Sequence, residues 1–179
     1  MGVNIEVIDR NEGIGLLIVD TLVDMNFLPP LWVTSVQDMV NKVKGILGSQ
    51  KMDNFYILGH GGSGYQAVGA GTHHDGTGNL SLQLGSDGEL VGDGRALLPG
   101  LRPYLSDSCV VTLGGCQVAT GTAGPALLAK VSQALGNVPV RAGADDQGPR
   151  PGLQGNITTC RGAVCSTGPT SWAPITSPF

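Results

Sequence analysis

Charged residues are scarce in this chain of 179 residues, and no group of basic residues stands out. Only 13% of the residues are Asp, Glu, Lys or Arg, whereas soluble domains contain about 25%. The formal net charge is −4. Nucleic acids and anionic membranes both attract clusters of Lys and Arg, so the composition argues against either as a partner.

Long hydrophobic runs are also missing. No stretch approaches the roughly 18 consecutive apolar residues of a membrane-spanning helix. The first residues lack the basic segment and apolar core that mark a signal peptide. We therefore expect no membrane span and no signal peptide in this chain. Low charge with abundant Gly, Ser and Thr suits an exported or surface protein, but it leaves the compartment open.

Cysteine occurs at only four positions, Cys109, Cys116, Cys160 and Cys165. Their spacing is not that of a tetrahedral zinc site, and four cysteines are too few for a disulfide scaffold of this size. Cys160 and Cys165 either pair as a disulfide, which export would favour, or are inert. We expect no metal and no other cofactor. The alternative is the sequence His73-His74-Asp75, which has metal-binding side chains but lies in a glycine-rich segment.

Glycine is abundant, with 29 residues, so tight turns should be frequent. The length suffices for one domain with its own core. We expect an α/β domain over residues 1–147. A Gly-, Pro- and Thr-rich segment follows over residues 148–179 and can supply edge strands to the same domain.

Apolar periodicity predicts alternating strands and helices. Helices are expected at residues 34–47, 94–105 and 122–135, and Thr34 with Gln37 forms a capping-box pattern at the start of the first. Residues 61–80 are expected to form a mobile loop that gates the site. Residues 3–8 alternate in polarity and predict a half-exposed strand, whereas the apolar residues 14–19 predict the first central strand. Further strands are expected before His60 and at 80–84, 110–113, 138–142, 155–159 and 163–166.

Two of these strands end in glycine next to a reactive side chain. The first reads Leu58-Gly59-His60-Gly61 and the second Leu113-Gly114-Gly115-Cys116. Ligands of open α/β sheets bind beyond the carboxyl ends of the strands. If the strands are neighbours, an imidazole base and a thiol nucleophile meet there. The N–H groups of Gly61 and Cys116 are then the natural donors to an oxyanion.

Each of these residues also has a simpler interpretation. A single cysteine is usually a small buried hydrophobe, and a single histidine is more often a structural hydrogen-bonding residue. Two strand ends that each supply one member of a dyad favour catalysis. Asp145 and Asp146 follow another strand at the same edge and are candidates to select a basic residue beside the cleaved bond. The alternative for this pair is a solvated turn that caps the strand.

The two motifs resemble the mark of the caspase-like cysteine peptidases, in which one apolar strand ends in His-Gly and a second ends in a small residue and Cys. This clan includes caspases, gingipains, clostripain and the self-cleaving domains of large bacterial toxins. The chain resembles it over residues 14–147. It looks most like an uncharacterised bacterial domain near the start of very large surface or adhesin-like proteins, a likeness that extends through residues 114–121 and 141–146. The chain departs from the pattern at 66–79 and after residue 148.

The resemblance implies a caspase-like three-layer α/β sandwich with a mostly parallel central sheet and helices on both faces. It also implies a bacterial cysteine endopeptidase with a His60/Cys116 dyad that cleaves a protein or peptide, either its own chain or a partner. The first alternative is a catalytically silent surface or interaction module with the same fold. The second is an acyltransferase or other thiol hydrolase that uses the same dyad.

Overall fold

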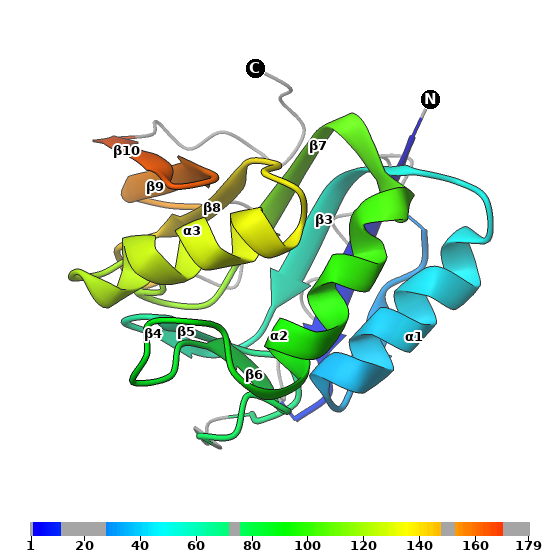
Figure 1. Ribbon diagram of the computed structural model, residues 1–179, viewed down its shortest axis with the longest axis horizontal. Coiled ribbons are helices and arrows are strands. Elements are labelled where there is room, and N and C mark those ends of the chain that lie inside the picture. Colours follow the sequence, from blue (N-terminus) through cyan, green and yellow to red (C-terminus); the bar gives the residue numbers. More distant parts are fainter. Residues whose placement is uncertain (1, 12–27, 72–75, 148–152, 170–179) are drawn as a thin grey trace.

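Seven strands form one mixed sheet (Figure 1). The computed structural model describes residues 2–11, 28–71, 76–147 and 153–169. In spatial order the strands are β10 (Val164–Pro169), β9 (Asn156–Arg161), β8 (Val140–Gly143), β7 (Leu105–Leu113), β3 (Met52–Leu58), β1 (Val3–Asp9) and β2 (Leu31–Val33). The strands from β2 to β8 pair in parallel, whereas β9 and β10 pair antiparallel. The α/β class is confirmed.

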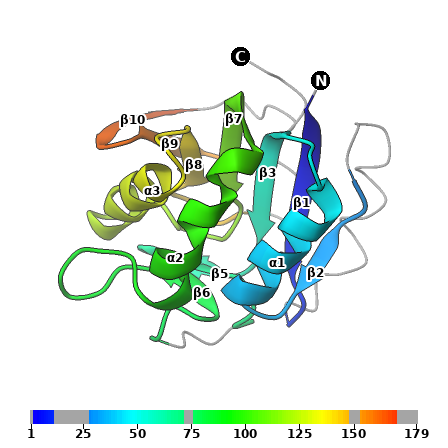
Figure 2. The ribbon, with the colours of Figure 1, turned by 45° about the vertical axis from the view of Figure 1, so that its right-hand side comes forward.

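The helices pack on one face of this sheet (Figures 1 and 2). They are α1 (Val36–Leu47), α2 (Gly92–Leu97), the 3-10 helix η2 (Leu98–Tyr104) and α3 (Ala123–Ala134). The strand order explains the arrangement. From β2 the chain passes to β3, β7 and β8, always in the same direction across the sheet, so right-handed crossovers all fall on the same side. Within the described residues, the predicted helices on both faces are therefore not found.

The hydrophobic core lies between this helical layer and the sheet. Alternate residues of each strand point toward the helices, as the pleat of a strand requires. From α1 and the central strands the core includes Val36, Met39, Val40, Val43, Leu47, Ile5, Val7, Phe55, Ile57, Val111 and Leu113. The apolar stripe of α1 that was visible in the sequence is thus the surface that packs against the sheet.

Strand β1 is more deeply buried than its alternating sequence predicts. It lies inside the sheet between β3 and β2, and Glu6 is only 1% exposed. Ile5 and Val7 face the helices, so Glu6 lies on the opposite face, in register with Tyr56 of β3. The prediction of a half-exposed strand is wrong because alternation separates the two faces without showing what covers the second. The strand expected at 14–19 lies outside the described residues.

Most other predicted elements are present. Helices α1 and α3 match the predicted ranges 34–47 and 122–135 to within two residues. The helix expected at 94–105 is divided into α2 and η2, because the prolines of η2 interrupt α-helical hydrogen bonding. The later predicted strands correspond to β7, β8, β9 and β10. None of the described helices has both the length and the apolar character that a membrane crossing requires.

A small second sheet replaces most of the predicted mobile loop. It consists of β4 (Gly61–Gly62), β5 (Tyr65–Ala67) and β6 (Ser81–Gln83), paired antiparallel. Ala67 and Val68 are fully buried, and a Cβ on Gly69 would overlap the main chain of Thr34. Residues 61–62 and 65–67 are thus strands where the sequence predicts a loop, because these glycines allow close packing of main chains. The strand expected at 80–84 is β6.

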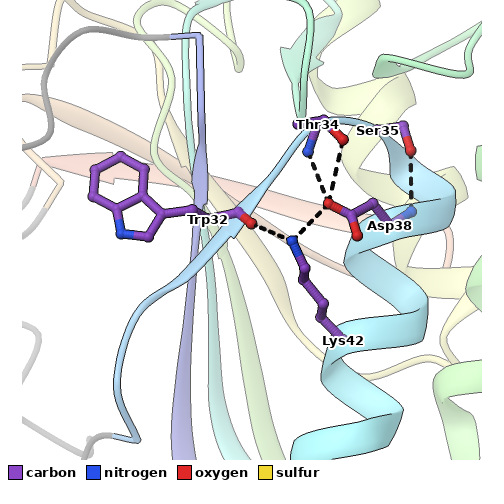
Figure 3. Close-up of polar contacts among 5 residues, drawn as sticks. All are labelled: Trp32, Thr34, Ser35, Asp38 and Lys42. Atoms are coloured by element: carbon purple, nitrogen blue, oxygen red, sulfur yellow. Dashed lines mark hydrogen bonds and ion pairs between the residues drawn. The ribbon is translucent and has the colours of Figure 1, made fainter.

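Helix α1 begins with an N-cap one residue later than predicted (Figure 3). Ser35 is the N-cap, and its hydroxyl accepts the Asp38 N–H at 3.0 Å. The Asp38 carboxylate accepts the Thr34 N–H at 3.1 Å and the Lys42 ammonium at 2.9 Å. The predicted pairing of Thr34 with Gln37 is therefore wrong. Partial burial opposes ionisation, but the hydrogen bonds from Lys42 and Thr34 outweigh it and lower the pKa of Asp38.

Substituting Ser35 should measure this cap directly. We expect Ser35→Ala to lower the free energy of unfolding by about 1 kcal/mol, because one amide of the first turn loses its acceptor. Gln37→Ala is the control and should stay within about 0.5 kcal/mol of the wild type. Chemical denaturation at pH 7 compares the three proteins. Equal losses in the two variants would show that Ser35 is not the cap.

A disulfide joins the last two strands of the sheet. Cys160 of β9 and Cys165 of β10 are in register and bonded. Cys160 is fully buried, and its sulfur lies 3.5 Å from the carbonyl oxygen of Pro125 in α3. Cys165 is exposed, as is all of β10. Of the two possibilities that the sequence left open, pairing and inert thiols, the structure has the pair.

Candidate functional site

The pairing of β3 with β7 brings both candidate catalytic residues to one edge of the sheet. Ile57 of β3 is in parallel register with Leu113 of β7. His60 and Cys116 each follow three residues later, so they occupy equivalent positions beyond the ends of neighbouring strands. Both residues are half-buried. The expectation that the two strands are neighbours is confirmed.

The main chains of the two strand ends touch. A Cβ on Gly115 would lie 2.7 Å from the Cα of Gly61, and a Cβ on Gly61 would lie 2.8 Å from the carbonyl oxygen of Cys116. No side chain fits at either position without moving the main chain. The glycines beside His60 and Cys116 are therefore what allows the two segments to approach so closely.

The Cys116 thiol contacts the main chain of Gln147, in the loop after β8. The Gln147 N–H points to Sγ with a nitrogen–sulfur distance of 3.3 Å, and Sγ lies 3.5 Å from the Gln147 carbonyl oxygen. The Gln147 side chain anchors this loop by accepting the Gln154 N–H at 2.8 Å and donating to the Asp145 carbonyl oxygen at 2.6 Å. The Gln147 main chain therefore lies directly beside the sulfur of Cys116.

The residue after Cys116 has a sparsely populated backbone conformation. Gln117 has a φ of 56°, in the left-handed region that non-glycine residues seldom adopt. Its N–H donates to the Asp145 carbonyl oxygen at 3.0 Å, and its side-chain amide donates to the Asp146 carboxylate at 2.8 Å. Strained backbone that is held by its surroundings is concentrated at functional sites, which agrees with a functional role for this turn.

Asp145 and Asp146 lie at the same edge of the sheet but make different contacts. The Asp145 carboxylate accepts the Asn156 N–H at 2.8 Å and so ties the loop to the start of β9. This contact matches the alternative of a structural cap. Asp146 is exposed, and its carboxylate reaches Gln117, next to Cys116. Both aspartates are exposed, and Asp146 is the one whose carboxylate contacts the turn of Cys116.

The predicted oxyanion donors have suitable main-chain surroundings. The Ala67 N–H donates to the His60 carbonyl oxygen at 2.8 Å, so the next pair of the hairpin, Gly61 with Gln66, is a non-hydrogen-bonded pair. The Gly61 N–H therefore points away from β5. Within the described residues the Cys116 N–H has no hydrogen-bond acceptor. The role of these two N–H groups as oxyanion donors stays a prediction.

Cys116 is also distinct among the four cysteines, all of which lie in the described residues. Cys160 and Cys165 are bonded to each other. Cys109 is a free thiol but is fully buried, and this burial, with a smaller contribution from Asp53, raises its pKa to about 12. Cys116 is the only free thiol that is partly exposed. A thiol-directed reagent should therefore find a single target in the folded protein.

The other candidate site lies outside the described residues. His73-His74-Asp75 was the alternative metal site, and the structure does not describe residues 72–75. Among the residues that it does describe, no three His, Cys, Asp or Glu side chains come together in a way that could hold a metal ion.

Two glutamines at this edge were not foreseen from the sequence. The Gln147 main chain meets the thiol, and the Gln66 side chain bonds to the residue before Cys116 at 2.8 Å. Each is a single polar residue in a glycine-rich or loop segment, with neither motif nor periodicity. Their contacts arise only when distant segments fold against the strand ends.

Comparison with known proteins found no matching family model, no matching curated protein and no matching solved structure. The function of this site is therefore argued from its own geometry.

Proposed function

We propose that the protein is a cysteine endopeptidase with Cys116 as nucleophile and His60 as general acid and base. The observation that carries this proposal is the register of β3 and β7, which puts the two residues at equivalent positions beyond neighbouring strands. The partial exposure of the Cys116 thiol supports it. The mixed sheet with its helices is compatible with a caspase-like sandwich, and the proposal includes that fold.

The proposed reaction has two steps. The Cys116 thiolate attacks the carbonyl carbon of a peptide bond, and the bond to nitrogen breaks as His60 donates a proton to the leaving amine. The product is a thioester on Cys116. His60 then takes a proton from a water molecule that attacks the thioester, and the carbon–sulfur bond breaks, which releases the acid and regenerates the Cys116 thiolate beside protonated His60. The N–H groups of Gly61 and Cys116 stabilise the oxyanion in both steps.

The substrate is a protein or peptide, either a partner or the protein's own chain. Asp146 offers a negative charge next to the Cys116 turn, which favours a basic residue beside the cleaved bond. The Gln147 main chain occupies the space next to the thiol, so an incoming peptide displaces or adds to this contact. The disulfide between Cys160 and Cys165 supports an exported or surface location, because such bonds persist in oxidising compartments.

One observation favours the alternative of a catalytically silent interaction module. Within the described residues, the Cys116 sulfur makes both of its polar contacts with the Gln147 main chain. A thiol that serves only to hold this loop would make the same contacts. The two functions differ in the ionisation of Cys116, which can be measured.

The rate of alkylation of Cys116 as a function of pH tests the proposal. With iodoacetamide and mass spectrometry, the folded wild type should give one adduct, at Cys116, with an inflection well below the ordinary thiol pKa of about 8.5. His60→Ala should move the inflection to about 8.5, because the imidazolium no longer stabilises the thiolate. Cys109 should remain unlabelled until the protein unfolds, since burial raises its pKa to about 12.

The contrary result is equally clear. If Cys116 reacts with an inflection near 8.5 and His60→Ala changes nothing, the two residues do not act together. The silent module would then be the better description of the protein.

A further inference from the structure

The side chain of Gln66 links the two strand ends that carry the candidate dyad. Gln66 lies in β5 and is fully buried. Its Oε1 accepts the N–H of Gly115 at 2.8 Å. Its Nε2 donates to the carbonyl oxygens of Ala67 at 2.9 Å and Gly59 at 3.4 Å. Both ends of the carboxamide are therefore bonded to main-chain groups.

Two of these main-chain partners lie next to the proposed catalytic residues. Gly59 and Gly115 are the residues immediately before His60 and Cys116, at equivalent places beyond β3 and β7. One carboxamide thus bonds to the residue before each member of the proposed dyad. It reaches both only because glycine stands at Gly115, where a Cβ would lie 2.8 Å from the Gln66 oxygen.

We propose that Gln66 is a positioning residue that fixes the separation of His60 and Cys116 by bonding to the residue that precedes each. This inference rests on the proposed function, since it assigns Gln66 a role in the same reaction. The sheet pairing of β3 and β7 ends at Ile57 and Leu113 with the bond from the Gly114 N–H to the Ile57 carbonyl oxygen at 2.9 Å, and the Gln66 bonds act on the residues that follow. A displacement of about 1 Å between reacting groups can lower a rate by about 100-fold, so a bond at this point affects catalysis strongly.

The chain offers a matched control for this role. Gln83 lies in β6 of the same small sheet and is 4% exposed, and its Oε1 has no hydrogen-bond partner in the part of the chain that the structure describes. Gln66→Met and Gln83→Met make the same chemical change at two buried glutamines. Only the first removes bonds to the strand ends, so a general effect of losing a buried carboxamide would affect both variants.

The experiment measures alkylation by iodoacetamide against pH, and kcat and KM on the peptide that the wild type cleaves fastest. For Gln66→Met we expect kcat to fall about 100-fold with KM changed less than about threefold. We also expect the alkylation inflection of Cys116 to rise to about 8.5, the value of a thiol without a positioned imidazole. Gln83→Met should leave both measurements as in the wild type.

Failure of this inference can be told from failure of the proposed function. If the wild type has a lowered inflection that depends on His60, and Gln66→Met keeps it and kcat, the dyad stands and Gln66 has no positioning role. If the wild type itself titrates near 8.5, the dyad is absent and the role of Gln66 falls with it.

A second variant decides the matter if Gln66→Met does not fold. Gln66→Glu keeps an acceptor for the Gly115 N–H, and while protonated it can still donate to a carbonyl oxygen. We expect its kcat to approach that of the wild type at pH 5 and to fall far below it as the carboxyl ionises. A kcat that follows the wild type from pH 5 to pH 9 would overturn the proposal.

Discussion

Replacing Cys116 with Ala should abolish peptide hydrolysis and leave the fold intact. The sulfur supplies the only bond that the proposed mechanism forms between protein and substrate, and loss of such a nucleophile lowers kcat by about 10⁴-fold or more. Cys116 is only partly buried in a turn, so removal of its sulfur should change the free energy of unfolding little. The measurement is hydrolysis of a fluorogenic peptide pool, with the intact protein incubated alone to detect self-cleavage.

Cys109→Ala is the matched thiol deletion. Cys109 lies fully buried in β7, on the same strand that leads to Cys116. This variant should retain hydrolysis but lose about 1 kcal/mol of stability, because a buried group is removed from the core. If Cys116→Ala hydrolyses the same peptides at the wild-type rate, another group is the nucleophile and the proposed mechanism is wrong.

Loss of His60 should also lower kcat, and its effect should depend on whether Cys116 is present. We expect His60→Ala to lower kcat by about 10² to 10⁴, the usual contribution of a general acid and base. Adding His60→Ala to Cys116→Ala should cause little further loss, because the two residues act as a unit. Independent, multiplying losses would indicate that His60 and Cys116 serve separate functions.

The backbone framework of this site could be predicted from the sequence, because it depends on local patterns. The apolar runs before His60 and Cys116 are parallel strands, and their glycines mark the place where the two main chains touch. For the same reason α1 and α3 are predicted to within two residues, and the strand that leads to Cys116 is predicted at its carboxyl end, although β7 begins five residues earlier than predicted. Each of these features follows from apolar periodicity or from a nearby residue, such as glycine, that ends a helix or strand.

Features that depend on contacts between distant segments could not be predicted. The glycines of residues 61–71 were interpreted as flexible, although they pack against the main chains of other segments. Gln66 and Gln147 reach the strand ends only in the folded chain. Helices on both faces are what the resemblance to the caspase-like clan implies, and the sequence itself does not show the order of the strands. Once that order is known, right-handed crossovers account for the single helical face in the described residues.

The burial of Glu6 is the most consequential of these unforeseen features. Its carboxylate oxygens are buried and have no hydrogen-bond partner among the described residues. In β3 its neighbour Tyr56 is also buried, and desolvation raises the pKa of Tyr56 to about 12 despite the opposing effect of Arg141. Glu6 and Tyr56 belong to a row of polar residues that continues with Thr112 and Arg141. The Arg141 side chain donates to the Thr112 hydroxyl at 3.0 Å. Glu6 is thus the end of a polar row on the face of the sheet opposite the helices.

This burial should make the stability of the protein fall as the pH rises. Desolvation raises the pKa of Glu6 from 4.5 to about 7. Below pH 4.5 the carboxyl is neutral in both folded and unfolded protein, so Glu6 does not lower the free energy of unfolding. Between pH 4.5 and 7 the unfolded chain ionises while the folded protein stays neutral, and the free energy of unfolding falls by about 3 kcal/mol in total. Above pH 7 the folded protein also ionises, and the loss is complete.

Glu6→Gln isolates this effect, because the amide has nearly the same shape and does not ionise. We expect the difference in the free energy of unfolding, wild type minus Glu6→Gln, to fall by about 3 kcal/mol between pH 4 and pH 8. Asp107→Asn, at an exposed position of β7, controls for the loss of one carboxyl group. Urea denaturation at closely spaced pH values measures all three proteins. The prediction is wrong if the free energies of unfolding of the wild type and Glu6→Gln change in parallel over this pH range. The Glu6 carboxyl would then contact solvent or a partner in the folded protein, and β1 would be less buried than its position inside the sheet indicates.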